Sequence, residues 1–159
     1  MASTLSSATM TVRVVESIKL NGTEQGAVNT KTISSINEIS KRIITITTTE
    51  SVIATFSAAA ASAGHYVAAD VRYMRFTNKD DTNFITLTFR NQDNDEVAIK
   101  LDAGQSFMWA ADNNGGMVDV FNATEDADAA SDTALGDLTN IQADANTASC
   151  DLEMFIASV

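Results

Sequence analysis

Proline is absent from this sequence, cysteine, histidine and tryptophan occur once each, and aromatic residues make up only 6% of the chain. With one cysteine, the chain cannot form an intrachain disulfide or a cysteine-based metal cluster, which excludes a disulfide-stapled mini-domain. With one histidine, any catalytic site that needs an imidazole base has a single candidate. Without proline, turns must rest on glycine, asparagine and aspartate.

Basic residues are also scarce. The 159 residues contain 10 Lys and Arg against 21 Asp and Glu, which gives a net charge of −11. No apolar run approaches the roughly 20 residues that cross a bilayer, and residues 1–10 lack the basic start and apolar stretch of a signal peptide. An acidic surface repels the phosphates of nucleic acids. We therefore expect no membrane insertion, no nucleic-acid binding, and one domain with its own core.

The charge is divided unevenly along the chain. Residues 1–79 carry eight basic and five acidic side chains, whereas residues 80–159 carry two basic and sixteen acidic ones. Most acids of the second half stand in turn-like clusters, which we interpret as solvated loops. The alternative is that one acidic face docks on a basic partner surface.

Period-two alternation, the mark of a half-buried β-strand, dominates the sequence. Ile85, Leu87 and Phe89 alternate with polar residues, and similar patterns follow one another with turn signals about every 8–12 residues. The segments expected to be strands are 11–20, 42–48, 51–56, 71–78, 84–91, 97–101, 106–110, 117–122 and 151–156. We predict an all-β fold, an antiparallel β-sandwich of jelly-roll type with roughly eight strands.

The domain prediction places a flexible N-terminal arm at residues 1–10 and a single sandwich domain at residues 11–159. Asn21-Gly22 is a turn pair typical of type I′ hairpins. The S-x-x-E pattern at Ser35 and Glu38 fits a helix capping box of one or two turns, and residues 57–63 suit a short helical turn or a loop. Because no proline can block a strand edge, edges must be charged or covered, and a neighbouring subunit would cover them.

His65 and Cys150 are the residues on which nucleophilic catalysis would depend. The sequence has no G-x-S-x-G motif, and no pattern links Cys150 to His65. We interpret His65 as a loop or interface residue and Cys150 as a small buried apolar residue at the start of the last strand. In the apolar run Phe107-Met108-Trp109, strand alternation buries either the two aromatic rings or Met108. The buried side chains lie either in the core or in a subunit interface, which they would anchor.

Two groups of acids resemble known kinds of site. The turn acids Asp80, Asp81, Asp93 and Asp95 could be imagined as a carboxylate pair for glycoside hydrolysis. The run 125–132 suggests a cation loop, but Ser131 stands where an EF-hand needs glycine, and Asp137 stands where it needs glutamate. We expect solvated loops in both places, and no catalytic residue, metal ligand or cofactor.

Two motifs carry a resemblance. R-x-T-N-x-D-D-T-N, from Arg75 to Asn83, precedes a predicted strand, and L-x-A-G-Q-S-F, from Leu101 to Phe107, turns into another. The stretch that contains them resembles small β-sandwich structural proteins encoded near the capsid genes of tailed bacteriophages. The resemblance covers roughly a third to half of the chain and transfers no functional residue. It implies a capsid decoration (cement) protein or another small virion component.

The function expected from the β pattern, the divided charge and this resemblance is that of a non-enzymatic decoration protein on the outside of a tailed-phage head. Its partners would be the major capsid protein and further copies of itself, as a homotrimer or homodimer. It would be made in the host cytoplasm and reside on the capsid surface of the virion. One alternative is another virion component, such as a tail, baseplate, connector or fibre-adaptor module. A second is a lectin-like receptor-binding sandwich, which would need an aromatic-rimmed pocket.

Overall fold

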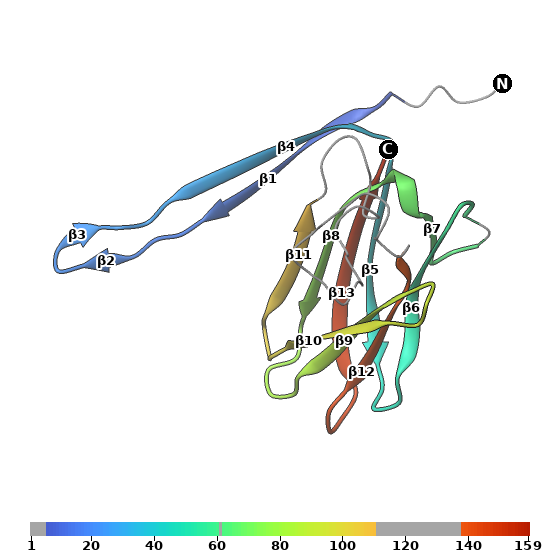
Figure 1. Ribbon diagram of the computed structural model, residues 1–159. Coiled ribbons are helices and arrows are strands. Elements are labelled where there is room, and N and C mark those ends of the chain that lie inside the picture. Colours follow the sequence, from blue (N-terminus) through green and yellow to red (C-terminus); the bar gives the residue numbers. More distant parts are fainter. Residues whose placement is uncertain (1–5, 61, 111–137) are drawn as a thin grey trace.

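The computed structural model describes residues 6–60, 62–110 and 138–159. These residues form thirteen strands and one turn of 3-10 helix, Ala68–Asp70. The strands are β1 (Ala8–Val15), β2 (Lys19–Leu20), β3 (Thr23–Glu24), β4 (Val28–Ile36), β5 (Glu38–Ile46), β6 (Ser51–Ser57), β7 (His65–Val67), β8 (Val71–Asn78), β9 (Ile85–Asn91), β10 (Glu96–Leu101), β11 (Ser106–Ala110), β12 (Leu138–Ala145) and β13 (Cys150–Ser158). Strands β5 to β13 build a sandwich, and β1 to β4 build a hairpin that projects from it (Figure 1).

The two sheets of the sandwich have the orders β10-β9-β12-β6-β7 and β11-β8-β13-β5. We number the strands of the sandwich from one to eight in chain order and leave out β7. One sheet, read as β5-β13-β8-β11, then has the order 1-8-3-6, and the other, read as β6-β12-β9-β10, has the order 2-7-4-5. This order is the jelly-roll topology, in which successive strands cross between two packed sheets. The predicted all-β sandwich of jelly-roll type is therefore confirmed. Among the described sandwich strands, β6 and β7 form the one parallel pair.

The core lies between the two sheets, where the alternating residues of each strand meet. Ile85 and Leu87 of β9 are fully buried, and Phe89 is 2% exposed, as their shared parity predicts. The Phe89 ring lies 5.5 Å from the Phe107 ring and 6.0 Å from the Trp109 ring, both in edge-to-face contact. Met108 is 46% exposed on the opposite face of β11. Of the two alternatives for this run, the structure shows the one in which the aromatic rings face the core, where both are partly buried.

The helix expected at Ser35 is wrong. Met10 pairs with Ile33 and Ala8 pairs with Ile36, so β4 has one residue more than β1 over this interval, and Ser35 takes up a left-handed conformation with φ 63°. The extra residue is a β-bulge that brings two isoleucines three positions apart onto the same side. Residues 38–46 then pair with β13 over nine positions. This long-range pairing outweighs the local capping signal.

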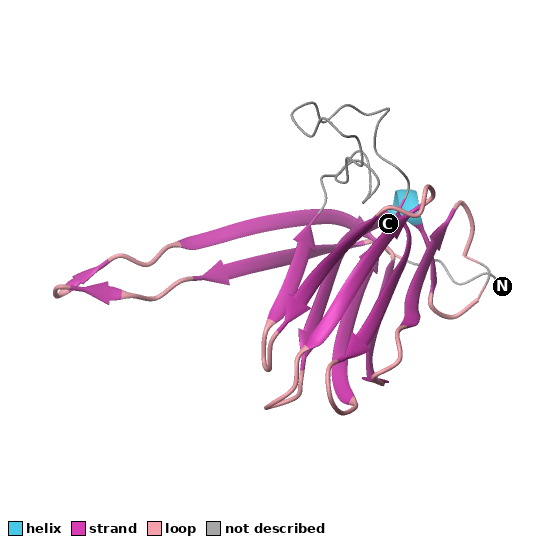
Figure 2. Ribbon diagram, turned by 60° about the horizontal axis from the view of Figure 1, so that its bottom comes forward, coloured by secondary structure: helices cyan, strands magenta, loops and turns pink. Residues whose placement is uncertain are grey.

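Other boundaries differ from the sequence-based expectation. Strand β12 was not expected, and the described part of residues 57–63 forms the end of β6 and a loop without helix. The expected strand 117–122 lies outside the described residues. Strand β1 begins at Ala8, so the expected boundary between an arm of residues 1–10 and a domain from residue 11 coincides with no structural boundary. The segment that projects is the hairpin of residues 8–36, which we call the arm (Figure 2).

The base of the arm is fixed to the sandwich by a second, smaller apolar cluster. Ile33 is fully buried and Ile36 is 3% exposed, and they pack with Tyr73 of β8 and Ala157 of β13. Tyr73 and Ala157 belong to the outer face of the four-stranded sheet, because the residues that precede or follow them, Met74 and Ile156, face the core. The arm therefore starts by covering one end of this outer face.

Replacement of Ile33 by alanine tests this anchor. Removing a fully buried isoleucine side chain lowers stability by about 2–5 kcal/mol. Here the lost stability is that of the contact between the arm and the sheet. We expect Ile33→Ala to raise amide hydrogen exchange in residues 8–15 and 28–36 while β9 and β13 keep their protection. Val28→Ala is the matched control, because Val28 is 51% exposed. Equal exchange in both variants would contradict the anchor.

Candidate interaction surface

The arm is a continuous hairpin because its turn and its middle are both held by local contacts. Asn21 and Gly22 have φ values of 49° and 83°, the two positive values that a type I′ turn requires. The backbone N–H of Glu16 donates to Ala27 at 2.8 Å, and that of Gln25 donates to Ile18 at 2.8 Å. These bonds bridge the interval between the β1–β4 pair and the β2–β3 pair. The predicted turn at Asn21-Gly22 is confirmed.

Two further features hold the irregular middle of the arm. The Glu24 carboxylate accepts hydrogen bonds from the backbone N–H of Ile18 at 3.2 Å and of Gly26 at 3.0 Å. A side chain at position 26 would collide with the carbonyl oxygen of Glu16, so this position requires glycine. Local contacts thus continue the hairpin from its base to its tip, although the arm lies away from the sandwich (Figure 1).

The outer part of the arm exposes an unusual number of apolar side chains. Val15 and Leu20 are each 60% exposed, Ile18 is 57% exposed and Val28 is 51% exposed. Val15 and Val28 are direct cross-strand neighbours, so they form a single apolar patch. An isolated two-stranded hairpin is marginally stable in water unless a further surface covers its apolar side. The outer arm therefore has the composition of a contact surface.

The outer face of the four-stranded sheet carries a second set of exposed apolar residues. Ile39 and Ile43 of β5 are 58% and 60% exposed. Ile39 pairs with Ala157, and Ile43 pairs with Glu153, so both lie in the rows of this outer face. Ile39 is thus a direct neighbour of the residue that the arm base covers. The sequence did not indicate these two positions, because both parities of residues 38–46 contain isoleucine.

Ion pairs occupy the centre of the same outer face. The Glu153 carboxylate on β13 pairs with the Arg75 guanidinium on β8 and lies 3.7 Å from the Lys41 ammonium on β5. The hydrogen bond from Arg75 is the largest cause that lowers the pKa of Glu153 below its ordinary 4.5, and the positive charge of Lys41 adds to it. Thr77 joins this group through its hydroxyl, which receives a hydrogen bond from Arg75.

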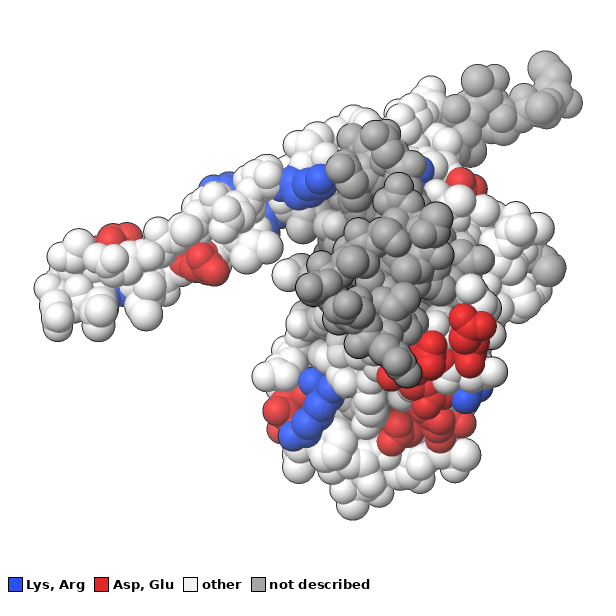
Figure 3. All heavy atoms as spheres, viewed as in Figure 1, with Lys and Arg blue, Asp and Glu red and all other residues white. Residues whose placement is uncertain are grey.

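Charge is distributed differently on the arm and on the sandwich. Residues 8–36 carry three basic and two acidic side chains, whereas the rest of the described chain carries seven basic and twelve acidic ones. Figure 3 shows a largely uncharged arm and acidic side chains gathered over the lower part of the sandwich. The acidic run 125–132 and its suggested cation loop lie outside the described residues.

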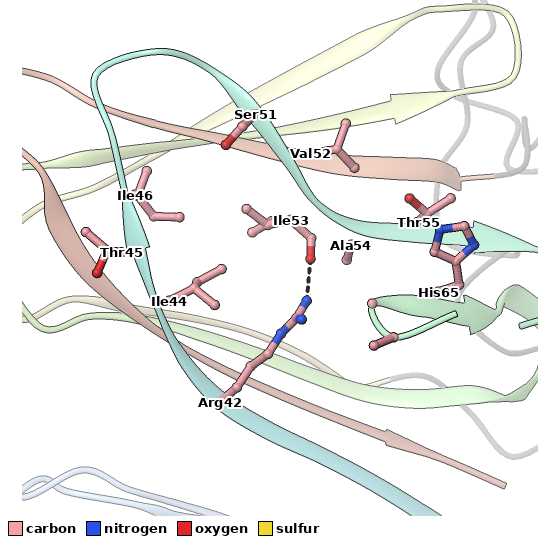
Figure 4. A pocket seen from close by; sticks show the side chains of 12 residues that line it. Arg42, Ile44, Thr45, Ile46, Ser51, Val52, Ile53, Ala54, Thr55 and His65 are labelled. Carbon is pink, nitrogen blue, oxygen red and sulfur yellow. Dashed lines mark hydrogen bonds between the residues drawn. The ribbon is translucent and has the colours of Figure 1, made fainter. Parts of the chain in front are cut away.

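His65 lies in an open groove between β5 and β6, with a volume of about 490 Å³ (Figure 4). The same groove contains Arg42, whose Nη2 donates to the carbonyl oxygen of Ile53 at 2.6 Å and so ties the two sheets together. Among the described residues, its other lining groups are hydroxyls and apolar side chains, without a carboxylate or a thiol. Sequence reasoning missed Arg42, since nothing in its own strand indicates that it bridges to β6.

The turn acids form loops instead of a carboxylate pair. Asp80 accepts hydrogen bonds from the backbone N–H groups of Thr82 at 2.8 Å and Asn83 at 2.6 Å, and the bond from Asn83 is the largest cause that lowers its pKa. Asp95 bonds with the Asn91 side chain in the loop that follows β9. The two loops stand at opposite ends of a seven-residue strand, about 20 Å apart, which far exceeds the separation of catalytic carboxylates in glycosidases.

Cys150 is buried at the start of β13, with 1% of its surface exposed. Burial is the largest cause that raises its pKa, and the negative charge of Asp80 adds to it. The structure therefore places Cys150 in the core, as the sequence predicts. Among the described residues, no group of three or more His, Cys, Asp or Glu side chains could hold a metal ion. The described residues also contain no helix long and apolar enough to cross a membrane.

Comparisons with protein-family models and with curated proteins find no match to this chain. The interaction surface described above therefore rests on the geometry of the chain itself. Its two parts are the outer arm, with Val15, Ile18, Leu20 and Val28, and the β5 stripe, with Ile39 and Ile43.

Acid titration tests the ion pairs around Glu153. Because the folded pKa is depressed, the stability that Glu153 contributes is present above its ordinary 4.5 and is lost as the pH falls through the lower folded pKa. We expect Glu153→Gln to lower the free energy of unfolding at pH 7, with the difference from wild type shrinking below pH 4.5.

Asp144 supplies a control of opposite sign. Burial is the main cause that raises its pKa, and the nearby Glu50 carboxylate adds to it, so ionised Asp144 lowers stability at neutral pH. Asp144→Asn should therefore raise the free energy of unfolding at pH 7. Chemical denaturation of both variants across the pH range gives the comparison, and a shift of the same sign for both would contradict these assignments.

Thiol labelling tests the burial of Cys150. A buried thiol with a raised pKa presents almost no thiolate to a reagent at pH 7. We expect a maleimide to label native protein only at the rate at which the core opens, and to label it at once in denaturant. Fast native labelling would show that Cys150 is accessible.

Proposed function

We propose that this chain is a non-enzymatic structural protein of a tailed-phage particle, a decoration or cement protein that binds the outside of the head. The observation that carries the proposal is the arm, a rigidly anchored hairpin that projects from the sandwich and exposes apolar side chains. A protein that acts by adhesion needs such a surface, because burial of apolar area is the main favourable term in protein association.

The fold is compatible with this proposal without deciding it. Jelly-roll sandwiches are widespread in viral capsid proteins and in lectin domains, and a fold alone does not define a function. The resemblance of residues 75–83 and 101–107 to phage structural proteins favours a capsid role over a lectin role. Among the described residues, the groove between β5 and β6 is lined by no Phe, Tyr or Trp, the adjoining groove that shares Arg42 and His65 is lined by Tyr66 alone, and the groove of about 330 Å³ beneath the arm is lined by Tyr73 alone. Lectin-like binding would need a more aromatic rim.

The major capsid protein and further copies of this chain are the proposed partners, with the chain acting as a homotrimer or homodimer. The acidic sandwich suits a basic patch on the capsid surface, and the apolar outer arm suits a neighbouring subunit. Strengthening of the head then follows from contacts that bridge neighbouring positions, since each bridge must break before the shell can open.

Shortening the arm tests the proposal. Residues 17–26 can be replaced by Asn-Gly, because Glu16 and Ala27 already share a backbone hydrogen bond of 2.8 Å and can close a two-residue turn. We expect the shortened chain to keep its far-UV spectrum and to bind phage heads that lack the protein at least about tenfold more weakly. Val52→Thr is the control, since Val52 is 56% exposed on the other sheet. Undiminished binding by the shortened chain would argue against an adhesive arm.

A further inference from the structure

The outer arm is not covered by the described part of the sandwich of its own chain. The cluster of Ile33 and Ile36 fixes the arm at its base, and only the single residue Asn37 separates β4 from β5. Strand β1 alone, with eight residues, spans about 27 Å, and the tip lies beyond it, away from the sheets (Figure 1). Among the described residues, therefore, no part of the same chain reaches Leu20 or Ile18, and a second molecule can cover them.

A complementary surface exists on the same chain. Ile39 and Ile43 stand two rows apart on the outer face of β5, each more than half exposed. This stripe continues the patch that the arm base covers, since Ile39 is the direct neighbour of Ala157. A hairpin that lies beside the arm base on this sheet would extend a contact of the kind the chain already makes.

Charge favours the same pairing. Residues 15–28 of the arm carry Glu16 and Glu24 against Lys19, a net charge of −1, and on β5 the exposed Lys41 stands between Ile39 and Ile43. Attraction between the outer arm of one molecule and Lys41 of another therefore opposes the repulsion between two acidic sandwiches.

We propose that the outer arm of one copy docks on the β5 stripe of a second copy of this chain, with Leu20 and Ile18 against Ile39 and Ile43. In a closed ring of copies every arm meets one stripe, so no arm is left uncovered. This inference rests on the homo-oligomeric form in the proposed function and assigns the surfaces that build it.

Sedimentation equilibrium of the full chain tests the pairing. Leu20→Asp and Ile43→Asp each place a charge in the interface at positions that are 60% exposed in the single chain, so the fold tolerates them. Val52→Asp is the matched control, with 56% exposure on the other sheet. We expect wild type and Val52→Asp to self-associate alike, and each interface variant to associate at least about tenfold more weakly. A wild-type chain that stays monomeric at about 100 µM, or variants that associate like wild type, would overturn the inference.

Cross-linking identifies the two surfaces directly. A chain with Leu20→Cys is mixed with a chain that carries Ile43→Cys, and a short bis-maleimide is added. We expect a cross-linked heterodimer, whereas wild type, whose only thiol is the buried Cys150, gives the background. No heterodimer above that background would contradict the docking even if the chain self-associates.

The outcomes separate this inference from the proposed function. A monomeric chain that still binds phage heads would end the inference and the homo-oligomeric part of the proposed function, and it would leave the head-binding role standing. A chain that self-associates through Leu20 and Ile43 but does not bind heads would support the inference and contradict the proposed function.

Discussion

The burial of Ile33 and Ile36 against the outer face of the four-stranded sheet is the contact on which the rest of the structure depends. The bulge at Ser35 places both isoleucines on one side, and the sheet supplies Tyr73 and Ala157 to receive them. Because this cluster fixes the base of the hairpin, the direction of the arm is set as well. An unanchored hairpin of this length would be mobile, and its apolar tip would have no defined place on a partner.

The anchor divides the molecule into two parts with different tasks. The jelly-roll sandwich has a core of its own, made of buried aliphatic and aromatic side chains. The arm adds almost no buried surface beyond its base and leaves its apolar residues in water, which costs solubility unless another molecule covers them. A chain that keeps such an arm has the features expected of a protein that works in an assembly.

The sequence predicts the sandwich better than it predicts the arm. The alternation at Ile85, Leu87 and Phe89, the turn at Asn21-Gly22 and the burial of Cys150 are confirmed, because each follows from local pattern or composition. The helix at Ser35 fails because nine pairs with β13 outweigh a local capping signal. Neither the projection of the arm nor the exposure of Ile39 and Ile43 could be predicted, since both depend on which face the folded sheets leave open. The head-binding role stays a prediction.

Electron microscopy of a tailed-phage particle assembled with this chain is the decisive experiment for the proposed decoration role. We expect density for the jelly-roll sandwich at many symmetry-related positions on the outside of the head, with the hairpin of each copy reaching the β5 face of its neighbour. Density confined to a few copies on the tail, or a head surface without it, would contradict a decoration role. Isolated copies on the head whose hairpins touch no neighbour would contradict the pairing of arm and sheet.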